Sequence, residues 1–324
     1  MIPETLRRLR RFVDRRVLGT APIILMYHRV ADIPADPWGL AVHPARFEEQ
    51  IDALTRARRV VHLHDLIEAE QSRTSRDKPL AAVTFDDGYH DVYSNARRIL
   101  RRYDCPMTLF LTTGAIGTAQ EFWWDAICRI FLEIEFLPPN LSFEVAGKAR
   151  HWSVPAFDQK SSREKIFYEI WAELRQRPYE AQMGGVDELG RWAGCSLVAR
   201  ESHRAMTKKE VRDISDGLVA IGAHTVTHPT LPAHRYENQY YEIAESRRIC
   251  EELIDSPVNA FAYPFGDHDD VTVAAVRQAG FSWACTVNAG VVRRGTDPTR
   301  LPRLFIGDWD GDEFQKRLAG DPFR

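Results

Sequence analysis

The sequence has few cysteines, no long apolar run and little net charge, and each absence excludes a class of protein. Its five cysteines are scattered over 324 residues without a CxxC pair, which argues against a disulfide framework and fits a reducing compartment. No stretch approaches 18 continuous apolar residues, so no membrane-spanning helix is expected. The formal net charge of −3 argues against a dedicated nucleic-acid binder, and we expect no nucleic-acid partner.

The first twenty residues are basic, with six arginines among the first sixteen. The apolar run that follows contains Gly19 and Pro22 and leads into His28 without the small-residue cleavage site of an export signal. We therefore predict a basic helix over residues 1–20 and a cytoplasmic protein. The arginines can also rest on an anionic membrane surface, which predicts a peripheral contact at the inner face of the membrane. A solvated helix in front of the domain is the alternative.

Beyond that segment, short apolar runs alternate with stretches in which apolar residues recur at helical spacing. The alternation predicts parallel strands covered by helices, which is an α/β fold. A last helix is expected between Asp312 and Gly320. The predicted strands are 22–26, 60–63, 80–85, 107–111, 218–223, 258–263 and 281–287.

Residues 118–205 break this alternation. They contain paired tryptophans, Trp123 and Trp124, the pair Pro138-Pro139, and several helical stretches. We interpret them as a mostly helical insertion with some irregular or strand-like sequence near 141–154.

Polar residues end three of the predicted strands. Asp86 and Asp87 follow the strand 80–85, His224 and His228 follow the strand 218–223, and the segment 261–266 ends a third. In parallel α/β folds the functional groups gather at the carboxyl ends of the strands, so we expect these groups to meet.

Two adjacent carboxylates repel each other when both are buried, and a divalent cation relieves this repulsion. One carboxylate can then bind the metal while the other stays free as a base. His224 and His228 are four residues apart, so one helical turn would place both imidazoles on one side. With one carboxylate they form an incomplete shell for a catalytic metal ion. Alone, a DDG sequence is usually a turn and an HxxxH sequence is usually incidental; together they are more specific.

The segments TFDDG (84–88), HTVTHP (224–229) and FAYPFG (261–266) resemble the motifs of the polysaccharide deacetylase family. This family is also called the NodB-homology or carbohydrate esterase 4 family. MYHRV (26–30) resembles the start of a branch that includes poly-N-acetylglucosamine deacetylases. The resemblance covers residues 21–117 and about 206–310.

The resemblance implies a distorted (β/α) barrel of seven strands. It predicts a deacetylase domain over 21–310, interrupted by the insertion 118–205 and followed by a helix and tail over 311–324.

The resemblance also assigns roles to residues. It implies that Asp86 is the general base and that Asp87, His224 and His228 hold one divalent metal ion. Zn²⁺ is the first choice for this ion, with Co²⁺, Ni²⁺ or Mn²⁺ as alternatives. Thr225 would brace the histidine loop, and the backbone N–H of Phe265 would stabilise the oxyanion.

Two positions depart from the family's motifs. Ala262 stands where the family often has the arginine that orients the base, and we hypothesise that Arg303 replaces it; a surface arginine is the alternative. The family's late histidine motif is absent, since no histidine follows His268. We therefore assign the general acid to His28, with a packed core histidine as the alternative.

The expected substrate is an N-acetylated saccharide or polysaccharide precursor, from which a metal-dependent hydrolase would release acetate. Two alternatives stay open: a catalytically silent saccharide-binding or scaffolding protein, and an O-acetyl esterase. The sequence leaves the oligomeric state open. The residues expected to line the substrate are Tyr263, Pro264, Trp283, Leu301 and His90, with Trp283 and Leu301 shaping an acetyl pocket.

Overall fold

The computed structural model describes residues 19–72 and 78–320. Most of the predicted basic helix over residues 1–20 therefore lies outside the described residues, as does the end of the tail. The membrane contact and the cytoplasmic location stay predictions. No helix in the described part of the chain is long and apolar enough to cross a bilayer.

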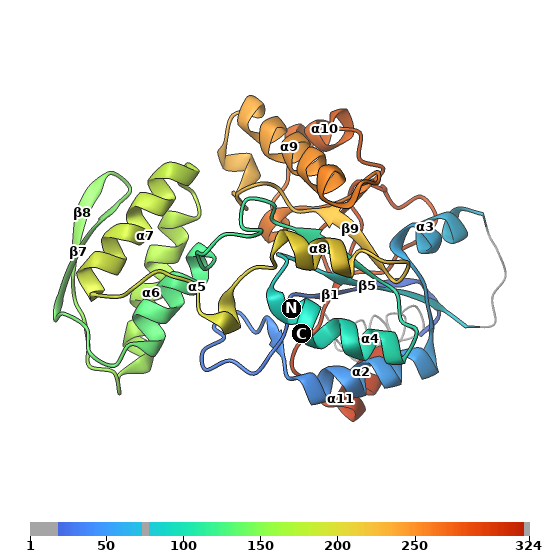
Figure 1. Ribbon diagram of the computed structural model, residues 1–324, viewed down its shortest axis with the longest axis horizontal. Helices are drawn as coiled ribbons and strands as arrows, with labels where there is room; N and C mark the ends of the chain where they lie inside the picture. Colours follow the sequence, from blue (N-terminus) through green and yellow to red (C-terminus); the bar gives the residue numbers. More distant parts are fainter. Residues whose placement is uncertain (1–18, 73–77, 321–324) are drawn as a thin grey trace, which may run out of the picture.

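The body of the protein is a curled parallel sheet that forms a half-barrel (Figure 1). Among the described residues, seven strands follow one another in the order β11-β10-β9-β6-β5-β1-β12, and β4 pairs with the start of β5. The parallel pairing confirms the predicted α/β barrel class. The strands are β1 (Ile23–Tyr27), β4 (Arg59–Val60), β5 (Leu80–Phe85), β6 (Met107–Leu111), β9 (Val219–Ala223), β10 (Ala260–Ala262), β11 (Trp283–Cys285) and β12 (Leu304–Phe305).

The sheet is buried on both faces, as is usual for parallel strands covered by helices. Along β1, Ile23 and Leu25 belong to the outer core, which they share with Phe47 of helix α2 (Pro44–Ala57). Ile24 belongs to a separate inner core, together with Leu66 of helix α3 (Leu63–Gln71). Adjacent residues of a strand thus serve different cores, because successive side chains point to opposite faces.

The remaining barrel helices lie around the sheet. Figure 1 shows α9 and α10 on one side of it and α2, α4 and α11 on the other. Asp269 caps α10 by accepting a hydrogen bond from the backbone N–H of Thr272. The helices are α4 (Arg97–Arg102), α8 (Lys208–Ile214), α9 (Tyr236–Ile254), α10 (Asp270–Gln278) and α11 (Gly311–Leu318).

The insertion forms a lobe beside the barrel, at the left of Figure 1. It is mostly helical, as expected, and the strand-like sequence near 141–154 is an antiparallel hairpin of β7 and β8. Its elements are α5 (Trp123–Cys128), β7 (Asn140–Val145), β8 (Lys148–Ser153), α6 (Lys160–Leu174) and α7 (Tyr179–Ala193).

Several strands differ from the sequence-based expectation. β10 and β11 are shorter than the predicted 258–263 and 281–287. The strand predicted at 60–63 ends at Val60, because α3 already begins at Leu63. β12 was not predicted: it has only two residues and directly follows the charged Arg303. It is a strand because Leu304 pairs with Leu25 of β1, a tertiary contact without a local signature.

Candidate metal and catalytic site

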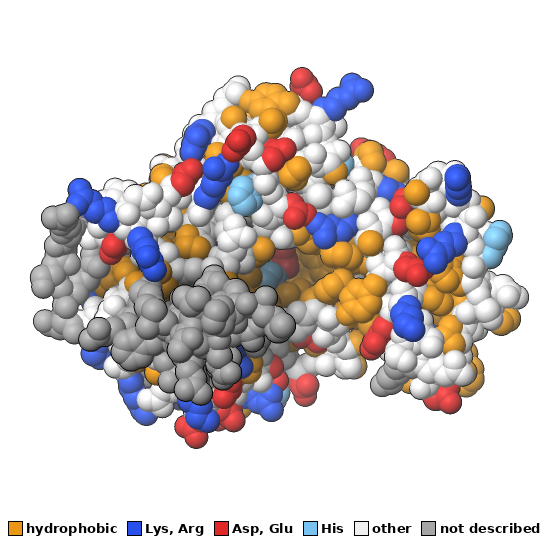
Figure 2. Space-filling view, turned by 180° about the vertical axis from the view of Figure 1, so that it is seen from behind, with side chains coloured by type: hydrophobic (Ala, Val, Ile, Leu, Met, Phe, Trp, Pro, Cys, Tyr) orange, Lys and Arg blue, Asp and Glu red, His pale blue; other side chains and the backbone are white. Residues whose placement is uncertain are grey.

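The polar residues that end the strands meet at one edge of the sheet. Arg303 precedes β12 and reaches Asp86 with its long side chain, whereas Asp86 and Asp87 follow β5 and His224 follows β9. The strands are parallel, so their carboxyl ends share this edge. Figure 2 shows a hollow in the middle of this face, with acidic and histidine side chains at its floor.

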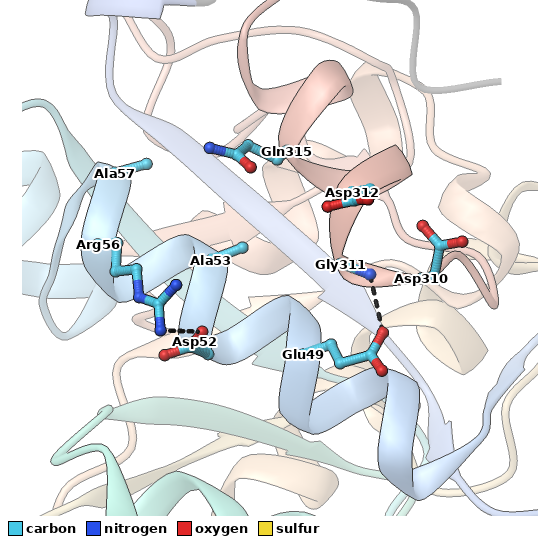
Figure 3. A pocket seen from close by; sticks show the side chains of 9 residues that line it. All are labelled: Glu49, Asp52, Ala53, Arg56, Ala57, Asp310, Gly311, Asp312 and Gln315. Atoms are coloured by element: carbon cyan, nitrogen blue, oxygen red, sulfur yellow. Dashed lines mark hydrogen bonds and ion pairs between the residues drawn. The ribbon is translucent and has the colours of Figure 1, made fainter.

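A second cavity, of about 570 Å³, lies elsewhere, between α2 and α11 on the outside of the barrel (Figure 3). Its lining includes Glu49, which accepts a hydrogen bond from the N–H of Gly311, and Asp52, which pairs with Arg56. None of the predicted site residues lines it.

Asp87, His224 and His228 form a compact, buried cluster. One oxygen of Asp87, Oδ1, lies 3.5 Å from the Nε2 atoms of both histidines. The two Nε2 atoms are 3.1 Å apart. All three residues are buried, and one ligand atom from each can point at a common centre.

The loop that presents the two histidines is not helical, so the reason given above for their meeting is wrong. Thr225 and His228 have positive φ angles, 65° and 60°, and the loop bends back on itself. The Thr225 hydroxyl donates to the His224 carbonyl at 2.5 Å and accepts from the His228 N–H at 3.0 Å. A β-branched residue rarely adopts this conformation, and such strain clusters at functional sites.

A carboxylate from α9 fixes the outer side of the same loop. Glu242 accepts hydrogen bonds from the backbone N–H groups of Val226 and Thr227, both at 2.8 Å, and from the Thr227 hydroxyl. The loop is therefore held from within by Thr225 and from outside by Glu242.

The cluster has the chemistry that a divalent metal requires. His224 Nδ1 lies 2.7 Å from the Ala262 carbonyl, which can only accept, so this nitrogen carries the proton and Nε2 keeps its lone pair. Asp87 Oδ1 is buried and has no hydrogen-bond partner among the described residues. Two imidazole nitrogens and one carboxylate form a shell that suits Zn²⁺ and related ions.

The pKa shifts of these groups fit the same interpretation. Burial, together with the nearby charges of Asp86 and Asp125, raises the pKa of Asp87 well above its usual value. Burial lowers the pKa of both His224 and His228. A cation among the three groups would stabilise the ionised carboxylate and bind the neutral imidazoles.

Asp86 has a different partner. Its two oxygens accept hydrogen bonds from the two terminal nitrogens of Arg303, both at 2.7 Å. The Arg303 side chain is fully buried and also donates to the carbonyl of Thr286 and the hydroxyl of Thr84. Burial alone would raise the pKa of Asp86, but the Arg303 guanidinium outweighs it and lowers this pKa.

His28 lies beside Asp86 at the same edge. Its Nε2 is 3.9 Å from Asp86 Oδ2, and its side chain is 15% exposed. Burial lowers the pKa of His28 to about 4, and the Asp86 charge opposes this shift only in part. The imidazole is therefore neutral near pH 7, and its role as general acid stays a prediction.

The third predicted segment contributes Phe265 and Pro264 to the edge of the site. The Phe265 ring packs against the His228 ring with their centres 4.5 Å apart, and Phe265 has a φ of 56°. Pro264 is buried. Tyr263 points elsewhere: it is fully buried in the outer core, and its hydroxyl donates to the Thr299 carbonyl.

The remaining predicted substrate contacts lie away from the metal cluster or inside the core. Trp283 starts β11, at the end of the strand opposite to the site, and its ring lies near His64 of α3. Leu301 is buried in the inner core, bridged to β11. His90 is drawn towards α8 by Glu210, whose oxygen is 3.1 Å from His90 Nδ1. The substrate contacts of these three side chains stay predictions.

A buried network behind the cluster was missed in the sequence. The Trp124 ring lies 4.7 Å from the His228 ring, and its indole N–H donates to the Tyr89 hydroxyl at 2.8 Å. Tyr89 in turn donates to Asp125 at 2.7 Å, and burial raises the pKa of Asp125 to about 6. Trp124 and Asp125 belong to the insertion, where no motif marks them.

The fold and the site together define an α/β half-barrel with a candidate metal centre and an ionised carboxylate next to it, a combination typical of metal-assisted hydrolases. The sequence model of a family described as polysaccharide deacetylase matches residues 73–133 and 190–284. The chain therefore contains a polysaccharide deacetylase domain. This confirms the predicted family and supports the prediction of a deacetylase enzyme.

Individual relatives are distant. YxkH of Bacillus subtilis (strain 168), named as a candidate polysaccharide deacetylase, is 21% identical over 101 residues, which are 31% of this chain. The match spans only 36% of that relative's length.

Solved structures resemble nearly the whole chain. The Streptococcus pyogenes deacetylase PplD, in complex with acetate, has a TM-score of 0.60 at 18% identity, with 94% of this chain and 99% of that chain covered. IcaB from Ammonifex degensii has a TM-score of 0.60 at 19% identity, with coverages of 93% and 97%. A de-N-acetylase from Aggregatibacter actinomycetemcomitans has a TM-score of 0.58 at 16% identity, with coverages of 92% and 99%. At these identities the likeness shows the fold.

Proposed function

We propose that this protein is a metal-dependent hydrolase that removes N-acetyl groups from a saccharide or polysaccharide precursor and releases acetate. The observation that carries the proposal is that two adjacent aspartates have different surroundings. Asp86 is held ionised by Arg303, whereas Asp87 Oδ1 faces two imidazoles and has no hydrogen-bond partner among the described residues. The names of the similar structures, which include a deacetylase with acetate and a de-N-acetylase, support this chemistry.

In this proposal Asp87, His224 and His228 hold the metal, with Zn²⁺ the first choice and Co²⁺, Ni²⁺ or Mn²⁺ as alternatives. When bound, such an ion polarises the acetyl carbonyl and lowers the pKa of water. The hydrogen bond from His224 to Ala262 and the brace of Thr225 orient the two imidazoles for this role.

Asp86 is the proposed general base. Because Arg303 lowers its pKa, the carboxylate is ionised at neutral pH and can accept a proton from the attacking water. The bidentate contact with Arg303 also fixes the plane of the carboxylate. We therefore assign Arg303 a positioning role for Asp86.

His28 is the proposed acid for the leaving amine. Its pKa of about 4 means that it enters the reaction as a neutral imidazole, so it must gain a proton before it donates one. The carboxylate of Asp86, 3.9 Å away, is a neighbouring group that can relay this proton. The backbone N–H of Phe265, whose ring contacts His228, is the proposed donor to the developing oxyanion.

The test is acetate release from N-acetylglucosamine oligomers and from O-acetylated sugars, with the metal-loaded protein. We expect release from the N-acetylated compounds, and a fall in kcat of about 10²–10⁴-fold in Asp86→Asn and in His28→Gln. Asp308→Asn is the matched control, because Asp308 is an exposed aspartate paired with Arg46.

Full activity of Asp86→Asn would rule out the proposed base. Release from O-acetylated sugars alone would make the protein an O-acetyl esterase. No release from any substrate by a folded, metal-loaded protein would support the catalytically silent alternative.

A further inference from the structure

The two imidazoles of the metal cluster are oriented by different means. His224 is fixed by a hydrogen bond from its Nδ1 to the Ala262 carbonyl, at 2.7 Å. The Nδ1 atom of His228 is buried and has no hydrogen-bond partner among the described residues. Its ring packs instead against two aromatic rings: the centre of the Trp124 ring lies 4.7 Å away, and that of Phe265 lies 4.5 Å away. Side-chain packing therefore sets the direction in which His228 Nε2 points.

The Trp124 ring is itself held in one orientation. Its indole N–H donates to the Tyr89 hydroxyl at 2.8 Å, and this hydroxyl donates to Asp125 at 2.7 Å. An indole N–H can only donate and a carboxylate can only accept, so the chain of hydrogen bonds runs in one direction. Phe122 stacks on the Trp124 ring, with the ring centres 4.7 Å apart and the planes at 11°. All three aromatic side chains are buried, and a rotation of the indole would break both the hydrogen bond and the stack.

The other end of this chain of contacts is anchored in the barrel. The guanidinium of Arg29, a residue that is 1% exposed, lies 4.2 Å from the centre of the Tyr89 ring. Arg29 also pairs with Asp91 at 3.0 Å, and Asp91 accepts a hydrogen bond from the backbone N–H of Val30 at 2.8 Å. Helix α5, which carries Trp124, lies at the junction of the lobe with the barrel (Figure 1). The contacts therefore tie the first helix of the insertion to the segment that follows β1.

We propose that Trp124 is a positioning residue for the metal ligand His228, and that Tyr89 and Asp125 keep Trp124 in place. The first helix of the insertion then controls how tightly the cluster binds its metal ion. This inference rests on the proposed function, which includes a metal ion in the cluster. An imidazole binds a metal through a lone pair in the plane of its ring, so a tilt of the His228 ring weakens the bond. Loss of a group that orients a ligand typically lowers metal affinity about 10–100-fold.

A positioning role differs from a purely structural one in what its loss changes. Loss of packing alone lowers the free energy of unfolding and leaves the metal affinity of the folded protein as it was. Loss of orientation changes the metal affinity and the ligand geometry while the protein stays folded. Tyr89→Phe separates the two effects, because it keeps the ring that Arg29 contacts and removes only the hydroxyl that joins Trp124 to Asp125.

The experiment measures Zn²⁺ binding to protein that a chelator has freed of metal, by competition with a chromophoric chelator. In Trp124→Phe and in Tyr89→Phe we expect the Kd for Zn²⁺ to rise about ten-fold. The visible absorption of the Co²⁺-loaded protein should shift in both variants, because this absorption depends on ligand geometry. Asp125→Asn should bind Zn²⁺ more tightly than Asp125→Ala, since its amide oxygen can still accept the hydrogen bond from Tyr89.

Trp192→Phe is the matched control, for which we expect an unchanged Kd. It also removes an indole N–H of the insertion, one that lies on α7 and donates to the Asn140 carbonyl at 2.8 Å. Wild-type Kd values and Co²⁺ spectra in folded Trp124→Phe and Tyr89→Phe would overturn the inference. If Trp124→Phe does not fold, a wild-type Kd in both Tyr89→Phe and Asp125→Ala overturns it. Failure of the wild type to bind Zn²⁺ or to release acetate would instead count against the proposed function itself.

Discussion

Arg303 holds Asp86 through two hydrogen bonds of 2.7 Å, and both side chains are almost completely shielded from solvent. The two residues are separated by 217 positions in the sequence. This pairing explains how Asp86 and Asp87 can be neighbours with opposite behaviour. The Arg303 guanidinium keeps the Asp86 carboxylate ionised. Burial raises the pKa of Asp87, which faces the two imidazoles.

The first prediction concerns this pair. Arg303→Gln leaves a buried carboxylate without its counter-charge, so the free energy of unfolding should fall by about 3–5 kcal/mol. Chemical denaturation measures this change. Arg300→Gln is the control: Arg300 is paired with the exposed Asp270, and its loss should cost less than about 0.5 kcal/mol. Equal, small effects of both changes would show that the buried pair does not stabilise the fold.

The second prediction concerns metal binding. Dialysis against a chelator should abolish acetate release, and adding Zn²⁺ at about 100 times its Kd should restore it and stabilise the fold by about 2.7 kcal/mol. His228→Ala should remove most of this stabilisation, because it deletes one of three ligands. Metal content and thermal unfolding are the measurements. His234→Ala serves as a control outside the cluster. A chelated wild type that keeps both its activity and its melting temperature would contradict the metal centre.

The third prediction concerns the close packing beneath the histidine loop. A Cβ atom added at Gly222 would lie 2.4 Å from the Phe110 ring and 3.0 Å from the Ala260 carbonyl. Gly222→Ala should therefore destabilise the protein by about 1–3 kcal/mol, the usual cost of overpacking. Gly217→Ala is the matched control, since nothing lies within 4 Å of a Cβ atom added at that position. We expect urea denaturation to separate the two variants, and indistinguishable midpoints would refute the packing argument.

The fourth prediction concerns pH. His203 is 2% exposed, and its pKa is lowered to about 3 by burial and by the charges of Arg29, Arg200 and Arg129. Between pH 6.5 and about 3 the unfolded chain binds a proton at His203 that the folded chain does not. The protein should therefore lose stability as the pH falls through this window.

The corresponding measurement is the free energy of unfolding at several pH values. His203→Gln should flatten the part of the pH dependence that lies below pH 6.5. His64→Gln is the control variant, since it replaces a histidine whose side chain is 45% exposed. An identical pH profile for wild type and His203→Gln would contradict the assigned cause.

Much of the barrel could be predicted from sequence periodicity alone. The strands 80–85 and 107–111 agree with β5 and β6 residue for residue, because each is a compact apolar run that is buried on both faces. The two-residue strand β12 was not predictable, because its identity as a strand depends on β1 and not on its own sequence.

The site shows the same division. The polar residues at the ends of apolar strands predicted that three side chains would meet, and the structure places them in one cluster: Asp87, His224 and His228. The sequence did not predict that a bent loop carries the two histidines, because a spacing of four residues suits a helix equally well. Trp283 was expected to shape the acetyl pocket, but it starts β11, at the end of the strand opposite to the site.

The sequence by itself determined which residues can perform chemistry and which strand each one follows, because these properties depend on residue type and on local apolar patterns. Only the tertiary structure decided that Arg303 neutralises Asp86 and that Trp171 of the insertion reaches Phe265 beside His228. Such contacts join segments that are far apart in the chain. They depend on the curvature of the sheet and on where the insertion packs, and neither leaves a periodic signal in the sequence.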